Sequence, residues 1–235
     1  MQECRNNPVQ KDDAQQALSN AGVNVTLDPR ETNDFHTLLA AVHDCAETIQ
    51  GLPDYQPQPD LARYPRQDVH QPSAEEQALG NAWAHKVLIK GNPHGGPLAG
   101  KTVSIKDVIA IAGVPQFQGS DVIPSWTPKT DATVVTRVLD AGADIVGTSA
   151  CEHFCHSTSS FMNAQGVVDN PYAAGYSAGG STSGGAALVG AGLVDVTIGG
   201  DQGGSIRVPA ALSGCMSSLV NCPCPLSLWS VCNSC

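Results

Sequence analysis

Three short segments carry side chains that together could cleave an acyl bond. They are residues 104–107 (Ser-Ile-Lys-Asp), 179–185 (Gly-Gly-Ser-Thr-Ser-Gly-Gly) and 199–207 (Gly-Gly-Asp-Gln-Gly-Gly-Ser-Ile-Arg). Hydrolysis of an amide needs a nucleophile, a base that removes its proton, and hydrogen-bond donors for the oxyanion. The serines are candidate nucleophiles, and Lys106 can act as the base where burial favours its neutral form. Serine–lysine pairs are an established variant of the serine triad.

Glycines flank the serines of the second and third segments. Because glycine lacks a Cβ, it lets the backbone approach closely and lets several N–H groups point to one position. The pattern therefore predicts an oxyanion-binding loop beside a serine nucleophile. Taken alone, residues 179–185 could be a flexible linker. The presence of Lys106 and Ser205 at the two other segments favours the catalytic interpretation.

These segments resemble the amidase-signature family, whose catalytic set is Ser–cis-Ser–Lys. By this resemblance Ser205 is the nucleophile, Ser181 is the bridging serine and Lys106 is the base. The order and spacing of the three positions also agree with the family. The family enters its bridging serine through a cis peptide, which here is Gly180–Ser181.

The resemblance implies roles for neighbouring residues as well. The backbone N–H groups of the oxyanion loop correspond to Gln202, Gly203 and Gly204. Ser183 supports the site by hydrogen bonding, or else is a structural turn residue. Asp201 and Arg207 flank the nucleophile, and a local ion pair that holds the loop is favoured over substrate contact by Arg207.

The resemblance covers residues 97–212 and implies both a fold and an activity. The fold is α/β, a mixed sheet covered by helices, and the activity is hydrolysis of a small-molecule carboxamide through an acyl-enzyme, without metal or organic cofactor. The run Gly-Gly-Asp-Gln-Gly-Gly-Ser, with Cys151-Glu152-His153, resembles broad-specificity amidases. The alternative within the family is the A subunit of the glutamine-dependent tRNA amidotransferase.

Two other motifs invite different functions. Residues 95–102 fit the P-loop pattern G-x-x-x-x-G-K-[ST], but a P-loop needs a hydrophobic strand before it and a helix after it. Here Gly91-Asn92-Pro93-His94 precedes and a strand-like segment follows, so no nucleotide site is expected. A metal site is also conceivable, but buried structural residues are favoured at the four candidate ligands Cys151, His153, Cys155 and His156.

The bulk composition limits the remaining function classes. The hydrophobic fraction of 41% is enough for a core, and the net charge of −10 argues against a nucleic-acid partner. No apolar run is long enough to span a bilayer, and the polar N-terminus lacks the apolar stretch of a signal peptide. We therefore expect a soluble cytoplasmic protein without membrane contact. A homodimer is a separate expectation, for the full-length form.

The elements that must position these residues fall into three regions. Residues 1–94 are predicted to be a helical segment followed by a proline-rich linker. Its helices are expected at 11–21, ending at Gly22, and across an apolar stripe at 38–49 that Asp34 caps and Gly51 ends. Residues 53–73 are expected to be extended, with a short helix at 75–89.

Residues 95–213 are predicted to form the catalytic core. Strands are expected around Val103 and Ile105, at 145–146 and at 196–198. Helices are expected at 134–139, with Asp131 as cap and Gly142 as stop, at 184–193, and from Ser205 onward.

Residues 214–235 are predicted to be a divergent tail, because five of the nine cysteines fall there and the sequence departs from the family. A mis-spliced or frameshifted end is the more economical interpretation, with the family's C-terminal half missing and activity of this chain reduced. A catalytically inactive fragment is then the alternative to an enzyme. Zinc binding lacks a supporting histidine, and its candidate ligands are Cys222, Cys224, Cys232 and Cys235.

Overall fold

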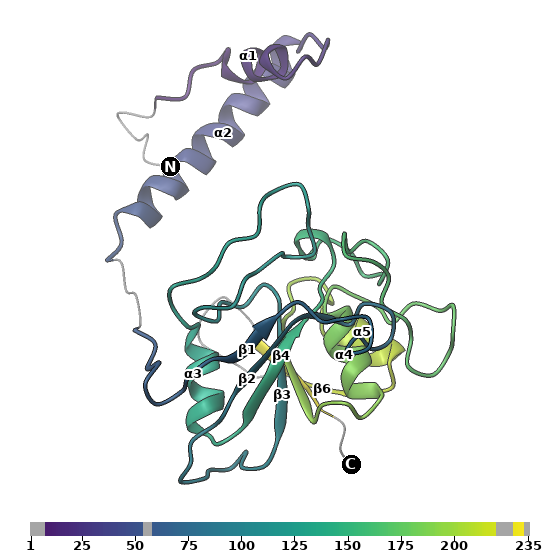
Figure 1. Cartoon of the computed structure of the whole chain (residues 1–235). Helices are drawn as coiled ribbons and strands as arrows, with labels where there is room; N and C mark the ends of the chain where they lie inside the picture. Colours follow the sequence, from purple (N-terminus) through teal and green to yellow (C-terminus); the bar gives the residue numbers. More distant parts are fainter. Residues whose placement is uncertain (1–7, 54–57, 220–227, 233–235) are drawn as a thin grey trace. The chain divides into compact units, whose positions relative to one another are not determined.

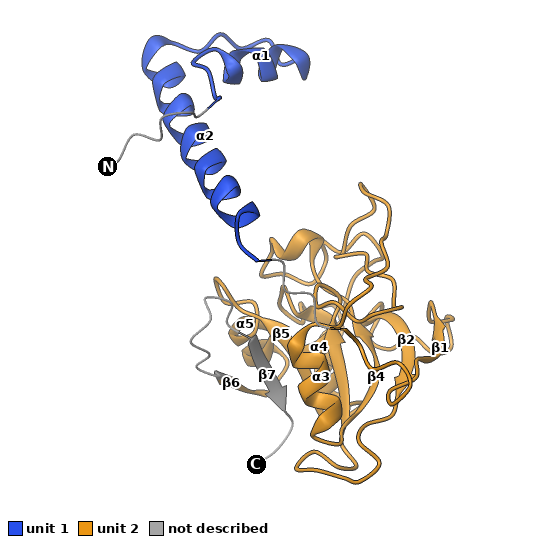
Figure 2. Ribbon diagram, turned by 90° about the vertical axis from the view of Figure 1, so that its left-hand side faces the viewer, with its two compact units in different colours: residues 1–55 blue, residues 56–235 orange. Residues whose placement is uncertain are grey.

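The computed structural model describes residues 8–53, 58–219 and 228–232 (Figure 1). The chain divides into two compact units, residues 1–55 and residues 56–235, which are coloured separately in Figure 2. The predicted boundary at residue 94 therefore lies inside the second unit. None of the helices within the described ranges is both long and apolar enough to cross a membrane.

In the described part of unit 1, residues 8–53, the helices are α1 (Asp13–Asn20) and α2 (Pro29–Gln50). The predicted stop after α1 is present, because Gly22 has a φ of +71°. The predicted cap at Asp34 is wrong, since α2 begins earlier with a capping box. The Asp28 carboxylate accepts from the backbone N–H of Arg30 and Glu31, and the Glu31 carboxylate accepts from the N–H of Asp28. A proline at the first helical position reinforces that start.

The predicted apolar stripe of α2 is solvent-exposed. Leu38, Val42 and Ile49 are 59%, 57% and 66% exposed, and no residue of this helix is buried. Its capping box and helix-forming residues therefore define it more than core packing does.

Unit 2 is built on a seven-stranded sheet with the order β1-β2-β4-β3-β5-β7-β6. The strands are β1 (Gln67–His70), β2 (Trp83–Ile89), β3 (Thr102–Lys106), β4 (Asp144–Ser149), β5 (Val196–Gly200), β6 (Met216–Leu219) and β7 (Leu228–Cys232). The central strand β3 runs parallel to β4 and β5, and the other pairs are antiparallel. The predicted mixed sheet is thus confirmed, and the C-terminal ends of three parallel strands meet at one edge.

Helices cover both faces of this sheet (Figure 1). α3 (Thr133–Asp140) packs on the face formed by Ile105 and Ile145, whereas α4 (Ser183–Gly190) packs on the opposite face with Val146. Successive strand residues point to opposite faces, so Ser104 and Lys106 face α4. A short α5 (Arg207–Leu212) begins at the end of the glycine-rich segment 199–207.

Residues 83–89 form a strand rather than the predicted helix. β2 pairs antiparallel with both β1 and β4, and its residues Trp83, Val87 and Ile89 are buried. β2 is a strand because β1 and β4 pair with it on both sides. Local residue propensity does not predict such pairing.

Two helix starts also differ from the predictions. Asp131 does not cap α3, because one oxygen accepts from the N–H of Ala112 at 2.8 Å and the other pairs with Arg66. α5 begins at Arg207, two residues after Ser205.

The predicted tail contributes two strands to the sheet. β7 pairs antiparallel with β5, and β6 pairs with β7 at the edge. Residues 216–219 and 228–232 therefore extend the sheet beyond the parallel strands. The candidate zinc ligands Cys222, Cys224 and Cys235, and the side chain of Cys232, lie outside the described residues.

Candidate active site

Lys106 occupies the C-terminal end of the central strand β3. Its side chain is only 1% exposed, and its Nζ donates a hydrogen bond to Oγ of Ser181 at 2.7 Å. The parallel register pairs Lys106 with Ser149 at the end of β4. The fold therefore brings a buried lysine side chain to the sheet edge where a glycine-rich segment ends and α4 begins.

Ser181 is completely buried just before α4, and the peptide bond between Gly180 and Ser181 is cis, as the resemblance implies. Its carbonyl accepts from the N–H of Glu152 at 3.2 Å. A Cβ added at Gly180 would lie 2.2 Å from the carbonyl oxygen of Ser159. The glycine before the serine is therefore required by close contact with the neighbouring loop.

Ser205 lies on the loop between β5 and α5 and is 9% exposed. Its carbonyl accepts from the N–H of Thr182 at 3.2 Å, which ties the two serine-bearing segments together. Among the described residues its hydroxyl makes no hydrogen bond, to Ser181 or to any other group, and Ser205 lines the pocket described next.

Lys106 and Ser205 line one pocket of about 920 Å³. The loop residues Gln202 and Gly203 line it on one side, and Phe154, Cys155 and His156 line it elsewhere. The structure thus brings Lys106 against Ser181 and brings Ser205 into the same pocket as Lys106. A serine, a lysine and a glycine-rich loop therefore line one site.

The three residues of the predicted oxyanion loop differ in their available N–H groups. Within the described ranges the backbone amides of Gln202 and Gly203 donate to no acceptor. The N–H of Gly204 instead donates to Oδ1 of Asp201 at 2.8 Å. Two of the three amides are therefore free to bind an oxyanion, and the third helps to hold the loop.

Asp201 clamps the loop that carries Ser205. Its carboxylate accepts from the backbone N–H groups of Gly204, Ile206 and Arg207 and from the Arg207 guanidinium at 2.9 and 3.0 Å. The hydrogen bond from Arg207 is the main cause that holds the pKa of Asp201 well below its ordinary value. The Arg207 side chain is 61% exposed, which fits the loop-holding ion pair rather than substrate contact.

Ser183 hydrogen-bonds to a buried carboxylate. Its Oγ donates to Oε1 of Glu152 at 2.9 Å, and the other oxygen of Glu152 accepts from the N–H of Met162 at 2.8 Å. Burial raises the pKa of Glu152. We did not predict a role for Glu152 from the sequence, although an acidic residue three positions after the buried end of β4 was a usable signal.

The candidate metal ligands near β4 lie in different environments. Among the described residues, no group of three His, Cys, Asp or Glu side chains is arranged to hold a metal ion. Cys151 is fully buried, and Nε2 of His153 lies 3.2 Å from the Ser120 hydroxyl. Cys155, in contrast, lines the pocket.

The P-loop-like stretch 95–102 leads into β3. We expected no strand before this stretch, but β2 precedes it and ends at Ile89. A strand rather than a helix follows, and Nζ of Lys101 pairs with Asp195 at 2.9 Å. The stretch therefore lacks the helix N-terminus on which a P-loop holds phosphate.

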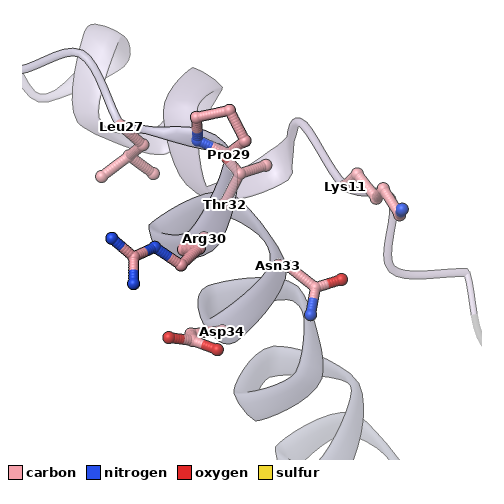
Figure 3. A pocket seen from close by; sticks show the side chains of 7 residues that line it. All are labelled: Lys11, Leu27, Pro29, Arg30, Thr32, Asn33 and Asp34. Carbon is pink, nitrogen blue, oxygen red and sulfur yellow. The ribbon is translucent and has the colours of Figure 1, made fainter.

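Unit 1 has a pocket of its own, of about 590 Å³ (Figure 3). Its lining comes from the start of α2, the preceding turn and Lys11, and it contains none of the predicted catalytic residues.

A family model described as Amidase matches residues 69–216 of this chain. An enantioselective amidase of Rhodococcus rhodochrous is 50% identical over 145 residues, which are 61% of this chain and 28% of the relative. The A subunit of the glutamyl-tRNA(Gln) amidotransferase of Haloarcula marismortui is 49% identical over 119 residues, which are 51% of this chain and 28% of the relative. The matched region thus spans about 28% of the length of these relatives.

Two solved structures are also similar to this chain. The Kluyveromyces lactis allophanate hydrolase superposes with a TM-score of 0.52 and 28% identity, covering 58% of this chain and 24% of that one. The A subunit of the glutamyl-tRNA(Gln) amidotransferase of Thermotoga maritima superposes with a TM-score of 0.51 and 34% identity, covering 54% of this chain and 29% of that one.

Proposed function

Because this chain belongs to the amidase-signature family, we propose that it hydrolyses carboxamides to a carboxylic acid and ammonia or an amine. Ser205 is the nucleophile, Ser181 relays its proton and Lys106 is the base. The observation that carries the proposal is the 2.7 Å hydrogen bond from the buried Lys106 to Ser181, at a pocket that Ser205 also lines.

In the first half of the reaction, neutral Lys106 takes the proton of the Ser181 hydroxyl while Ser181 takes the proton of Ser205. Oγ of Ser205 attacks the amide carbonyl carbon, and the carbonyl π electrons move to oxygen. The amides of Gln202 and Gly203, which have no other acceptor among the described residues, donate to that oxyanion. The proton returns through Ser181 to the amide nitrogen, the C–N bond breaks, and an ester remains on Ser205.

In the second half, water takes the place of the departed amine. Lys106 and Ser181 remove its proton, its oxygen attacks the ester carbon, and Ser205 leaves with the proton. Asp201 keeps the loop amides and Ser205 in place throughout, because its carboxylate is bound to three backbone N–H groups of that loop. No metal or organic cofactor takes part in these steps.

A second candidate is an amide-transferring role like that of the amidotransferase relatives. The 49% identity to the Haloarcula relative supports it. Both functions begin with cleavage of a carboxamide, and they differ in the amide that is used. Glutamine is the discriminating substrate.

The test is ammonia release from a panel of aliphatic and aromatic primary amides and glutamine. It uses the 235-residue chain and a version extended by the segment that follows in the Rhodococcus relative. We expect low turnover by the short chain. Large apolar side chains such as Phe161 and Tyr176 are exposed on unit 2, and exposed apolar surface favours aggregation, which lowers the amount of active enzyme. The extended chain should turn over simple amides and lose that activity in Ser205→Ala.

The matched control is Ser183→Ala, which removes a buried serine hydroxyl that hydrogen-bonds to Glu152, whereas Lys106 donates to Ser181. Exclusive use of glutamine would favour the amidotransferase role. Absence of turnover on every amide by folded protein would favour a non-catalytic role. Turnover unaffected by Ser205→Ala would contradict the assignment of the nucleophile.

A further inference from the structure

Asp107 directly follows the proposed base Lys106 at the end of β3, and its side chain binds a loop. Asp107 is only 1% exposed, and its Oδ2 accepts hydrogen bonds from the backbone N–H groups of Phe117 at 2.9 Å and Gln118 at 2.8 Å. Backbone N–H groups that are shielded from water need an acceptor, and losing it is costly. The carboxyl group of Asp107 therefore anchors two consecutive loop residues to the strand that carries Lys106.

Gln118 is the residue at which this anchored loop reaches the pocket. It lines the pocket together with Lys106 and Ser205. Its φ is +55°, in the left-handed region that non-glycine residues seldom adopt. Such a conformation persists only where the surrounding contacts enforce it, and the hydrogen bond from the Gln118 N–H to Asp107 is one such contact.

The same loop supports a second pocket residue, Phe154. Its N–H donates to the carbonyl of Gln118 at 2.9 Å, and Phe154 also lines the pocket. The two segments pack closely here, because a Cβ added at Gly119 would lie 2.2 Å from the carbonyl oxygen of Cys151. Hydrogen bonds thus run from Asp107 to Gln118 and from Gln118 to Phe154, and we call these two pocket residues the Gln118–Phe154 wall.

Other contacts hold the base of this loop independently of Asp107. The Phe117 ring stacks on His85 of β2 with 4.7 Å between the ring centroids. One residue earlier, Gln116 and Trp126 exchange backbone hydrogen bonds of 2.9 and 3.3 Å. Neither contact binds the N–H of the next residue along the loop, so loss of Asp107 should loosen the wall while the loop base and the sheet persist.

We propose that Asp107 is a positioning residue for amide binding, because it holds the Gln118–Phe154 wall of the pocket in place. The inference rests on the proposed hydrolysis and adds to it a determinant of substrate affinity. Among the described residues the Asp107 carboxyl group makes no hydrogen bond to Lys106, Ser181 or Ser205. An interaction that only shapes the binding pocket acts equally on substrate and transition state, so its loss raises KM and leaves kcat unchanged.

The first test is amide hydrogen exchange of the 235-residue chain, resolved by residue with NMR, in the wild type, Asp107→Asn and Asp107→Ala. Asparagine keeps a side-chain oxygen that can accept both N–H groups, whereas alanine removes it. In Asp107→Ala we expect the amides of Phe117, Gln118 and Phe154 to exchange about tenfold faster, because local opening no longer breaks the anchoring bonds. Asp107→Asn should keep most of the protection.

Two comparisons control this measurement. In the wild type the amides of Gln202 and Gly203, which have no acceptor among the described residues, should exchange faster than those of the anchored loop. The matched variant is Asp195→Ala, which removes the acceptor of a backbone N–H at the opposite end of β3. It should leave the exchange of Phe154 unchanged.

The second test is steady-state kinetics of the extended chain, with the primary amide that it hydrolyses fastest. We expect Asp107→Ala to raise KM about tenfold and to change kcat by less than about threefold. Asp107→Asn and Asp195→Ala should both keep a KM near that of the wild type. An equal rise of KM in Asp107→Asn and Asp107→Ala would assign the effect to the lost charge and would overturn the positioning role.

Failure of this proposal is distinguishable from failure of the proposed hydrolysis. Absence of turnover by the wild-type extended chain contradicts the hydrolysis, and hydrogen exchange still decides whether Asp107 holds the wall. Protection of Phe154 that is unchanged in folded Asp107→Ala would overturn the proposal. Exchange of Phe117 and Gln118 as fast as that of Gln202 in the wild type would overturn it too, even where a variant fails to fold.

Discussion

Ser181 and Ser183 are two buried serines of one segment that have different partners. Ser181 accepts from Lys106, whereas Ser183 donates to Glu152. Replacing Ser181 by alanine breaks the proposed proton relay, and we expect the rate of amide hydrolysis to fall by about 10²–10⁴-fold. Replacing Ser183 by alanine should mainly reduce the free energy of unfolding, by about 1–3 kcal/mol, because the buried Glu152 loses a donor.

Ammonia-release kinetics and urea unfolding of both variants check this difference. An equal loss of kcat in the two variants at equal folded concentration would contradict a relay specific to Ser181.

Asp201 is expected to stabilise the loop that carries Ser205 through backbone contacts more than through its ion pair. Asp201→Ala leaves the N–H groups of Gly204, Ile206 and Arg207 without their acceptor and should lower the free energy of unfolding by about 1–3 kcal/mol. Arg207→Gln removes only the charge of an exposed side chain, so it should have a much smaller effect. Urea denaturation of the two variants is the measurement, and a larger loss in Arg207→Gln would refute this ranking.

At the scale of elements, helix α4 depends on glycines to approach the sheet. A Cβ at Gly184 would lie 2.2 Å from the carbonyl oxygen of Ala82, which borders β2. Gly184→Ala should therefore move α4 and cost about 1–3 kcal/mol of stability, as other overpacked cores do. Gly203→Ala is the matched control for stability, because nothing lies within 4 Å of its added Cβ. Thermal unfolding measures both, and equal midpoints would contradict the close packing of α4.

Asp195 joins the starts of β3 and β5 and makes this junction acid-sensitive. The N–H of Thr102 is the main cause that lowers the pKa of Asp195 to about 2, and Lys101 contributes after it. Because the pKa is lower in the folded state than the unfolded value of about 3.9, the contribution is present above pH ~4. It is lost as the pH falls toward ~2.

We expect the difference in unfolding free energy between the wild type and Asp195→Asn to be largest near pH 6 and to close toward pH 2. The carboxylate is partly exposed, so solvent reduces the size of this difference. Lys101→Met should keep most of the pH dependence, since Thr102 is the larger cause. A pH-independent gap in urea titrations would show that ionisation of Asp195 plays no part.

At the scale of the whole molecule, the two units should be thermodynamically separable. Both core clusters of unit 2 consist of residues from Tyr64 onward, and the buried residue of unit 1 is Ala14 among those described. A chain that begins at residue 56 should therefore unfold with a free energy within about 0.5 kcal/mol of that of unit 2 in the intact chain. Differential scanning calorimetry of both chains tests this, and a drop of several degrees in the midpoint of unit 2 would show that unit 1 stabilises it.

The sequence by itself determined the family, the mixed α/β fold and the strands that carry the candidate site. Val103, Ile105 and the 196–198 run alternate or cluster in patterns that are local, so they predict β3 and β5 without knowledge of their partners. The glycine-rich motifs likewise point to Lys106, Ser181 and Ser205, whose catalytic roles stay predictions.

Only the tertiary structure decided the features that depend on distant partners. Residues 83–89 are a strand because β1 and β4 pair with them, and Asp131 serves Ala112 and Arg66 rather than a helix N-terminus. The N–H of Gly204 points to Asp201, and Cys155 reaches the pocket through a left-handed turn. Hydrogen bonds across long sequence separations fix the strand at 83–89 and the role of Asp131, and local propensity does not predict them. The bond between Gly204 and Asp201 is local, but it depends on the conformation of a loop that residue spacing alone does not specify.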